Sequence, residues 1–520
     1  MSTNNIIVLV AFAFYLALMI LIGVFYSRNT KNNEDYFLGG RNLGGWTAAL
    51  SAQASDMSGW LLMGLPGAVY IAGTGQIWIA IGLLIGTVLN WYIVASRLRK
   101  YTIVSGNSLT IPTFFQNRYR DKVGVIKIVS AIIIAIFFAV YTASAFSSGA
   151  KLFATLFGNS KDGKLDNTAY LIGLTIAAVV ILIYTFMGGF KAVCTTDFIQ
   201  GMLMLVAILA VPIVTYAMLS HDSSFAEALK SHGVNDPGSF LNIMKDGDGN
   251  DNSFVSIVSN LAWGLGYFGM PHIIIRFMAI KNDHEVKKSR RIGITWVVIS
   301  LAASCFIGVV ARGFITPALD DKSSETAFIR LIQQIFTDNN VLIFIGGIFL
   351  CGILAAIMST ADSQLLVTAS AVSEDMYKGV IKKDATEKSA LWVGKIAVVI
   401  VAVIAFLIAL DPESSIMGLV SNAWAGFGAA FGPVVLLALF WKRSNLAGAI
   451  SGMSIGALTI IVWEYIPLIG GQTLAAATQL YSLVPGFFLA LIVNVVISLI
   501  TKAPSKEIQD EFDSVKTFNS

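Results

Sequence analysis

The sequence predicts an all-α polytopic membrane protein that crosses the bilayer thirteen times. Of its 520 residues, 56% are hydrophobic and 13% carry a charge, which is more apolar surface than a soluble domain needs. The apolar residues form runs of about 20, the length at which a helix spans the hydrocarbon core. A cleaved signal peptide is the alternative for the first run, 6–26, but no Lys or Arg precedes it and no small-residue cleavage pattern follows.

Thirteen apolar runs are the predicted membrane spans. They cover residues 6–26, 46–70, 77–97, 128–149, 169–190, 198–219, 254–280, 292–314, 341–374, 391–410, 415–441, 446–463 and 481–501. The predicted organisation is a first helix with its loop (1–45), a five-helix unit (46–219), a second five-helix unit (254–441), two peripheral helices (442–501) and a polar tail (502–520). We expect this tail to be at most partly ordered.

Basic residues divide unevenly between the two sides of the predicted membrane. Cytoplasmic loops are rich in Lys and Arg. If the N-terminus lies outside, 27 of the 35 basic residues fall in inner segments or at the span ends beside them. The eight exceptions are Lys151, Lys161, Lys164, Lys230, Lys245, Arg312, Lys322 and Arg330. The pattern predicts an outer N-terminus and a cytoplasmic C-terminus, and it explains the basic composition without nucleic-acid binding.

No pattern of reactive residues indicates an enzyme, a redox site or a structural metal. The three cysteines and four histidines are scattered, and no nucleophile–base pair is apparent. The external loop 246–251 begins like a calcium loop, but Asp251 stands where glycine is needed and Ile257 where glutamate is needed. We interpret it as a solvated acidic loop.

The second span holds polar residues and glycines where a membrane helix should be apolar. Residues 51–60 read Ser-Ala-Gln-Ala-Ser-Asp-Met-Ser-Gly-Trp, and Gly64, Pro66 and Gly67 follow. A charge at membrane depth costs at least a few kcal/mol. Non-helical backbone at that depth is tolerated only where it is buried in protein or lines a wet cavity. Asp56 in this broken segment therefore indicates a binding site.

Span seven is broken in a similar way. Gly264, Gly266 and Gly269 match the dinucleotide-binding fingerprint by spacing, but no strand–turn–helix unit surrounds them, so the match is accidental. Two interrupted spans five apart predict two inverted repeats of five helices, each with a broken first helix. Broken helices at corresponding positions of two halves point to a transporter's binding site.

The break in span two is the predicted solute site. A half-helix N-terminus attracts a carboxylate through its dipole and its unpaired N–H groups. Ser58 and Gly59 lie where such an anion is met, and Trp60 adds a rigid apolar face. Three aromatic residues at mid-depth on other spans are placed to enclose a small apolar ring with Trp60, namely Tyr141, Trp263 and Tyr267. A glycine kink used only for packing is the alternative.

Span nine carries hydroxyl residues that point to a cation. Ala356, Ser359, Thr360 and Ser363 recur at i, i+3, i+4 and i+7 and share one helix face. Two hydroxyls and a carbonyl that face carbonyls freed in a broken helix form a neutral oxygen cage, which suits a monovalent cation better than a divalent one. Hydroxyls that bond only within their own helix are an equally supported alternative.

Two further carboxylates fall at predicted membrane depth. Asp197 opens span six, where a helix N-cap is the ordinary explanation and a cytoplasmic exit route for a cation is the alternative. Asp362 lies on span nine, close to the hydroxyl residues. Arg276 is near the inner end of span seven, where we expect its side chain to extend toward the headgroups.

With these residues in place, the chain resembles the sodium:solute symporter family from Tyr15 to about Pro504. The motifs that carry the resemblance are Tyr36-Phe-Leu-Gly-Gly-Arg41, the segments 54–68 and 263–269, Met358-Ser-Thr360 and the segment 424–433. The resemblance implies a thirteen-helix version of the LeuT-like amino-acid transporter fold. It also implies import of L-proline across the plasma membrane, driven by Na⁺ as the coupling ion, with no organic cofactor.

The family's functional residues map onto matching positions of this sequence. The implied sodium ligands are the carbonyls of Ala54, Met57 and Ala356 and the hydroxyls of Ser359 and Thr360. The implied solute site comprises Ser58, Gly59, Trp60, Tyr141, Trp263, Tyr267 and Pro271. The resemblance also implies that Asp56 matters for sodium and that Asp197 belongs to the ion path. Relatives with a second sodium site use hydroxyls near Asp362 and Ser363, but Asp362 here replaces a hydroxyl.

Two other functions remain compatible with these residues. One is sodium symport of another small amino acid or a monocarboxylate. The other is a channel or a sensor derived from the same fold. A sensor usually carries a signalling domain, and the tail after Lys502 is short. A channel would conduct without a saturable, solute-dependent flux.

Overall fold

The computed structural model describes residues 2–27, 38–159, 165–187, 189–222 and 224–518, and it is almost entirely helical. The first half contains α1 (Thr3–Ser27), η1 (Gly39–Arg41), α3 (Gly45–Asp56), η2 (Trp60–Gly64), α4 (Leu65–Ala72), η3 (Gly73–Gln76), α5 (Ile77–Leu89), η4 (Asn90–Val94), α6 (Ala95–Val104), α7 (Ile111–Tyr119), α8 (Val125–Phe157), α9 (Asn167–Met187) and α10 (Phe190–Asp222). Residues 36 and 37 of the first family motif lie outside the described residues.

The second half begins with a loop region that carries short helices. Its helices are α11 (Phe225–Ser231), α12 (Pro237–Phe240), α13 (Phe254–Leu261), η5 (Ala262–Phe268), α14 (Pro271–Ala279), α15 (Asp283–Arg312), η6 (Ser324–Thr326), α16 (Ala327–Ile335), α17 (Asn340–Ser370), η7 (Ala371–Ile381), α18 (Glu387–Ile408), α19 (Ile416–Phe440), α20 (Leu446–Tyr465), α21 (Leu474–Thr478), α22 (Leu483–Ile500) and α23 (Lys506–Thr517). The strands β1 (Pro467–Ile469) and β2 (Gln472–Thr473) form a small antiparallel hairpin.

Eleven stretches of the described chain are long and apolar enough to cross a membrane. They confirm the helical, polytopic class, whereas the number thirteen stays a prediction. The difference arises at the two interrupted spans. Span seven is divided among α13, the 3-10 helix η5 and α14, and none of these reaches spanning length alone. The second half of span two continues through span three, so that Trp60–Val104 forms one stretch.

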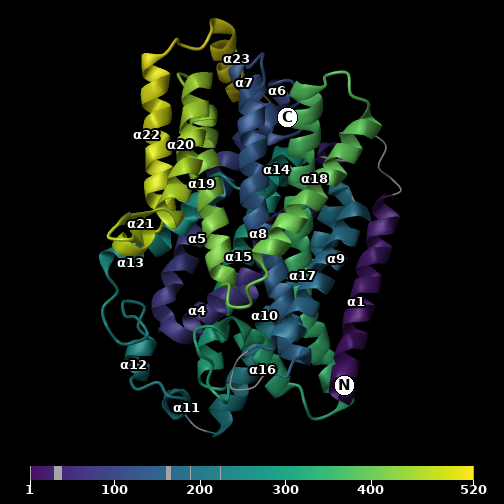
Figure 1. Ribbon diagram of the computed structural model, residues 1–520, viewed down its shortest axis with the longest axis vertical. Helices are drawn as coiled ribbons and strands as arrows, with labels where there is room; N and C mark the ends of the chain where they lie inside the picture. Colours follow the sequence, from purple (N-terminus) through teal and green to yellow (C-terminus); the bar gives the residue numbers. More distant parts are fainter. Residues whose placement is uncertain (1, 28–37, 160–164, 188, 223, 519–520) are drawn as a thin grey trace.

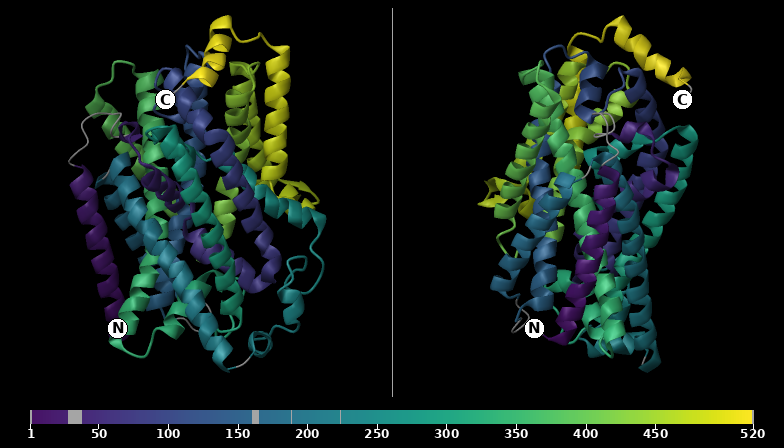
Figure 2. Two further views of the ribbon diagram at one scale, coloured as in Figure 1. Left: turned by 180° about the vertical axis from the view of Figure 1, so that it is seen from behind. Right: turned by 90° about the vertical axis from the view of Figure 1, so that its right-hand side faces the viewer.

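The long helices run roughly along the longest axis of the molecule (Figure 1). α1 begins at the lower end and α23 lies at the upper end, an arrangement that an odd number of crossings produces (Figures 1 and 2). Two long loop regions carry short helices, α11 and α12 between α10 and α13, and α16 between α15 and α17. These helices lie at the lower end with the start of α1 (Figure 1). Both loops therefore share one side with the N-terminal end of α1.

Both breaks have a local cause in the sequence. α3 ends at Asp56 because Met57 leaves the helical region, with φ −89° and ψ 79°, and the chain resumes as the π-helix η2. α14 starts at Pro271, which has no N–H and whose fixed φ suits a first helical position. Gly59 allows the first break to lie against α8, since a Cβ there would overlap the Ser148 side chain.

The segment η5 is held between two neighbouring helices. On one side it lies directly against α5, where a Cβ at Gly264 would overlap the carbonyl group of Gly82. On the other side the Trp424 indole of α19 donates to the carbonyl oxygen of Trp263 at 2.7 Å. Because Gly264 has no side chain, η5 can lie directly against α5.

The tail is more ordered than we expected. Its helix α23 packs with Phe512 only 5% exposed, and the guanidinium groups of Arg97 and Arg118 lie 5.0 and 5.3 Å from the Phe512 ring. Arg120 pairs with Glu511 at 2.6 Å. The expectation of partial order was wrong because the tail has an apolar face that α6 and α7 cover.

We predict that Gly264→Ala lowers the melting temperature of the purified protein. The added methyl group must displace main-chain atoms of α5, and such overpacking costs about 1–3 kcal/mol. Gly23→Ala is the matched control, because a Cβ at Gly23 meets nothing within 4 Å. Thermal unfolding in detergent measures both variants, and equal melting temperatures would contradict the close approach of α5 and η5.

Candidate functional site

The end of α3 meets the hydroxyl face of α17. Ser359 Oγ lies 2.8 Å from the Ala54 carbonyl oxygen, and Thr360 Oγ1 lies 3.4 Å from the same atom. Ser359 Oγ also lies 2.8 Å from the carbonyl oxygen of Ala355 and 3.3 Å from that of Ala356. One hydroxyl hydrogen cannot serve three carbonyl oxygens. The cluster therefore holds surplus oxygen lone pairs, which is the property that a cation site needs.

Four of the five predicted sodium ligands are thus brought together. The alternative that these hydroxyls bond only within their own helix is wrong, since Ser359 contacts the broken helix as well. Cation binding by this cluster stays a prediction. Met57, the fifth, is buried at the break itself. Its thioether sulfur accepts a hydrogen bond of 3.4 Å from Ser300 on α15. The carbonyl of Met57 therefore belongs to the non-helical turn next to the cluster.

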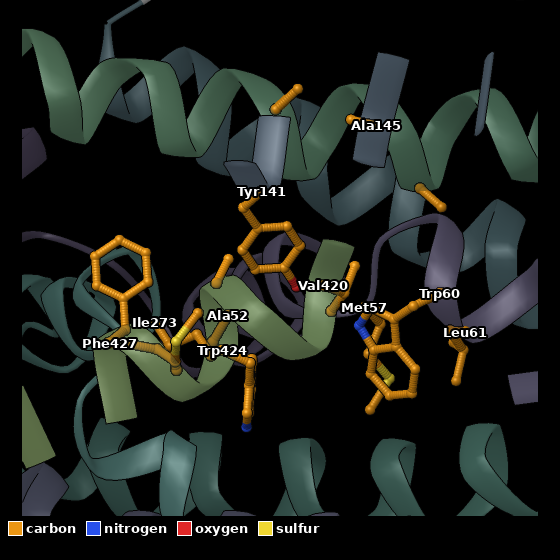
Figure 3. Packing of buried hydrophobic residues seen from close by; sticks show 14 of the residues in the cluster. Ala52, Met57, Trp60, Leu61, Tyr141, Ala145, Ile273, Val420, Trp424 and Phe427 are labelled. Carbon is orange, nitrogen blue, oxygen red and sulfur yellow. The ribbon is translucent and has the colours of Figure 1, made fainter. Parts of the chain in front are cut away.

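Asp56 gathers three of the predicted solute-binding side chains. Its carbonyl oxygen accepts from Trp60 Nε1 at 3.1 Å and from the Tyr141 hydroxyl at 3.3 Å. Its carboxylate Oδ2 accepts from the Tyr267 hydroxyl at 2.6 Å, while Oδ1 has no hydrogen-bond partner among the described residues. Figure 3 shows the Tyr141 hydroxyl directed toward the segment that carries Met57 and Trp60. All of these side chains are buried.

Trp263 lies apart from this group. Its ring stacks on Tyr481 with centroids 5.4 Å apart and the planes 22° from parallel. It is connected to the site only indirectly, through Trp424, whose ring meets Tyr267 edge-on at 5.0 Å. Pro271 begins α14 on the far side of the second break. The motif 424–433 had drawn attention to this part of α19, but its spacing does not single out Trp424 as a neighbour of the site.

Asp197 is not a helix cap. α10 begins at Phe190, before this residue, and Asp197 is fully buried within the helix. Its Oδ2 accepts from Ser51 at 2.7 Å, from Ser55 at 3.0 Å and from Arg276 at 3.2 Å. The N-cap interpretation was therefore wrong, because the helix continues in the N-terminal direction beyond the predicted span.

Arg276 does not extend toward the headgroups. Its side chain is 1% exposed and forms the buried ion pair with Asp197. The expectation failed because α14 packs inside the bundle against α3 and α17. Arg276, Ser51 and Ser55 are partners of Asp197 that the sequence pattern did not predict. The four-residue spacing of the two serines was the available signal, since it places them on one helix face.

The same cluster reaches α17. Ser363 Oγ lies 3.0 Å from Ser55 Oγ and accepts from Arg276 at 2.5 Å. Asp362, its chain neighbour, is fully buried, and neither carboxylate oxygen has a hydrogen-bond partner among the described residues. Asp197 contacts the guanidinium of Arg276 directly, and Asp362 lies close enough to interact with it electrostatically.

Two interrupted helices that meet at a buried polar centre, inside a bundle of membrane-spanning helices, define an ion-coupled solute transporter. The model of the sodium:solute symporter family matches residues 36–456, and the chain belongs to that family. The resemblance inferred from the sequence motifs is therefore confirmed. Members of this family are symporters rather than enzymes, and sodium is the coupling ion that the family implies.

Curated relatives match the chain along nearly all of its length. The sodium/proline symporter of Escherichia coli (strain K12) is 43% identical over 509 residues, which are 97% of this chain and 95% of the relative. The sodium/proline symporter of Staphylococcus aureus (strain USA300 / TCH1516) is 44% identical over 513 residues, with 97% and 94% covered. Both similarities extend across the two breaks and α17.

Two solved structures share the fold. A Na⁺-coupled sialic acid symporter in a substrate-bound outward-open state has a TM-score of 0.72, at 18% identity, with 96% of this chain and 98% of that one covered. A nucleobase-cation-symport-1 family transporter in a closed conformation has a TM-score of 0.52, at 12% identity, with 94% and 100% covered. These likenesses establish the transporter fold.

We predict strong thermodynamic coupling between Arg276 and Asp197. Removing one partner of a buried ion pair costs about 3–5 kcal/mol, because the other charge stays buried without compensation. Arg276→Met and Asp197→Asn should therefore each lower the melting temperature. Adding the second substitution to either single variant should lower it by less than the same substitution does in the wild-type protein. Thermal unfolding of the three variants in detergent measures this, and additive losses would contradict the pairing.

Proposed function

We propose that this protein is a sodium-coupled importer of L-proline that works by alternating access across the plasma membrane. The observation that carries the proposal is the division of roles at the end of α3. The Ala54 carbonyl meets the hydroxyls of α17, while the carbonyl of Asp56, two residues on, meets Trp60 and Tyr141. The two curated relatives described above are both named as sodium/proline symporters, which supports proline as the solute.

The proposed sodium site lies between the first break and α17. Its ligands are the carbonyls of Ala54, Met57 and Ala356 and the hydroxyls of Ser359 and Thr360. A cation there would replace the hydrogen bonds that the two hydroxyls now make to Ala54. The cage is neutral, which favours a monovalent ion. Asp197 belongs to the proposed ion path, because its carboxylate lies in the polar cluster that links α3, α10, α14 and α17.

The proposed solute site lies on the other side of the same break. Its members at the first break are Ser58, Gly59, Trp60, Tyr141 and Tyr267. Trp263 and Pro271, at the second break, are its more distant members. The carboxylate of the solute is placed at the half-helix start near Gly59, where main-chain N–H groups attract an anion. Asp56 Oδ2 accepts from the Tyr267 hydroxyl, and Oδ1 has no hydrogen-bond partner among the described residues. Oδ1 can then interact with the ammonium group of the solute or with the ion. Trp60 and Tyr141 supply the apolar enclosure for the ring.

Binding of the two cargoes is coupled because both require the same segment to be ordered. Sodium pins the end of α3 against α17, which orders the break and raises the affinity for proline. Reciprocity requires that proline tighten sodium by the same factor. An inside-negative potential of about 100 mV contributes roughly 2.3 kcal/mol per charge, and a tenfold sodium gradient adds about 1.4 kcal/mol. One sodium ion can then sustain a proline ratio of several hundredfold.

The proposed architecture has thirteen crossings, with an outer N-terminus and a cytoplasmic tail. The inverted repeats are 46–219 and 254–441, and 442–501 adds two peripheral helices. The broken segments α3–η2 and α13–η5–α14 occupy the first position of each repeat, which supports the pairing. Rocking of one repeat against the other would open the central site to each side in turn.

Uptake of labelled L-proline into proteoliposomes tests the proposal directly. We expect accumulation with an inward sodium gradient and an inside-negative potential, and none with inward potassium or proton gradients. Competition by other amino acids and by monocarboxylates identifies the preferred solute. If one of these competitors accumulates with sodium while proline is not taken up, that competitor is the solute instead of proline. A current that does not saturate as the solute concentration rises would indicate a channel.

We predict that Thr360→Ala and Trp60→Ala separate the two sites. Thr360→Ala removes a cage oxygen and should raise the sodium concentration for half-maximal uptake at saturating proline, because the cation loses a ligand. Trp60→Ala should raise the proline concentration for half-maximal uptake at saturating sodium, because the ring loses its apolar face. Initial uptake rates measure both. Unchanged sodium activation in Thr360→Ala would eliminate the assigned cage.

A further inference from the structure

One buried histidine has no role in the arrangement described so far. His272, the second residue of α14, is fully buried, yet neither ring nitrogen has a hydrogen-bond partner among the described residues. A buried polar group without a partner costs free energy, and native proteins rarely keep one without a reason. No spacing in the sequence distinguishes this histidine from the other three.

The His272 ring lies next to the proposed solute site. It meets the Tyr141 ring edge-on, with centroids 6.0 Å apart and planes at 85°, and the Phe138 ring at 5.5 Å. The Ser55 backbone and the Arg276 guanidinium both lie close enough to act electrostatically on the imidazole. Tyr141 also bonds the carbonyl of Asp56 through its hydroxyl. His272 and Asp56 therefore lie against the same tyrosine.

The start of α14 has few other groups to offer an anion. Pro271 has no N–H, and the N–H groups of Ile273 and Ile274 both bond the Met270 carbonyl oxygen at 3.1 Å. The imidazole of His272 is a side-chain donor at this helix start. An imidazole carries at least one N–H donor in every protonation state present near neutral pH. The second break therefore presents a donor side chain where the first break presents main-chain donors.

We propose that His272 binds the carboxylate of the transported solute, so that this carboxylate bridges the two broken helices. One carboxylate oxygen accepts from the half-helix start at Gly59, and the other accepts from the His272 ring N–H. A carboxylate has enough lone pairs for both contacts, and hydrogen bonds to an ionised acceptor are the strong ones. This inference rests on the proposed function, and it names the group that distinguishes an amino acid from a neutral solute.

The proposed carboxylate bridge is also linked to the buried ion pair of Arg276 and Asp197. Arg276, one helical turn further along α14, donates to the carbonyl oxygen of His272 and also to Asp197. A solute that draws His272 toward the first break therefore pulls on the same helix turn that holds the Asp197 carboxylate. Solute binding and the proposed ion path thus share α14 as well as α3.

Competition by L-proline and by L-prolinamide tests the proposal. Prolinamide keeps the ring and the amine but replaces the carboxylate with a neutral amide. In proteoliposomes that take up labelled proline, we expect His272→Phe to reduce the preference for proline over prolinamide by about tenfold or more. His272→Gln keeps a donor of similar reach and should retain most of the preference, while the shorter His272→Asn should lose it.

Phe138→Leu is the matched control. It alters the other ring against His272 without changing a polar group, so it should weaken both competitors together and leave their ratio unchanged. If His272→Phe shows no thermal unfolding transition, the Gln and Asn variants decide the question. An unchanged ratio in the folded variants would overturn the role of His272 and leave proline transport intact. If the wild-type protein neither binds nor takes up proline, the proposed function and this inference both fail.

Discussion

A helix that ends inside a membrane protein must find hydrogen-bond partners for the carbonyl groups it frees, because the bilayer core supplies none. α3 ends at Asp56, and the fold around it meets this requirement. The Ala54 carbonyl meets hydroxyls of α17, and the Asp56 carbonyl meets Trp60 and Tyr141. One local break thus draws α17 and α8 to the same point. These are the contacts that the proposed cation and solute would replace.

Charge imposes a second requirement on the same region. The buried carboxylate of Asp197 is compensated by Arg276, and two serines of α3 complete its shell. This pair ties α10 and α14 to α3, while Ser363 extends the cluster to α17. The polar centre is therefore one connected network rather than separate sites. A change in occupancy at either end can be transmitted through α3 and α14 by direct contacts.

Much of this centre is predictable from one sequence. The polar residues and glycines around Asp56 conflict with a continuous membrane helix, and the spacing of Ala356, Ser359 and Thr360 defines a helix face. The family motifs add the functional role expected for each of these residues. The interpretations of Asp197 and Arg276 failed for one reason, which is that each relied on distance from a predicted span end. Span ends are the least reliable feature of a hydropathy pattern.

By itself, the sequence determined the polytopic class, the two breaks and the helix face that carries Ser359 and Thr360, because these follow from composition and period along the chain. Only the tertiary structure decided which partners meet. It paired Arg276 with Asp197, placed Trp424 rather than Trp263 beside Tyr267, and buried the His272 ring with no hydrogen bond to the described residues. Such contacts join residues far apart in the chain, and no local pattern encodes which face of one helix meets another.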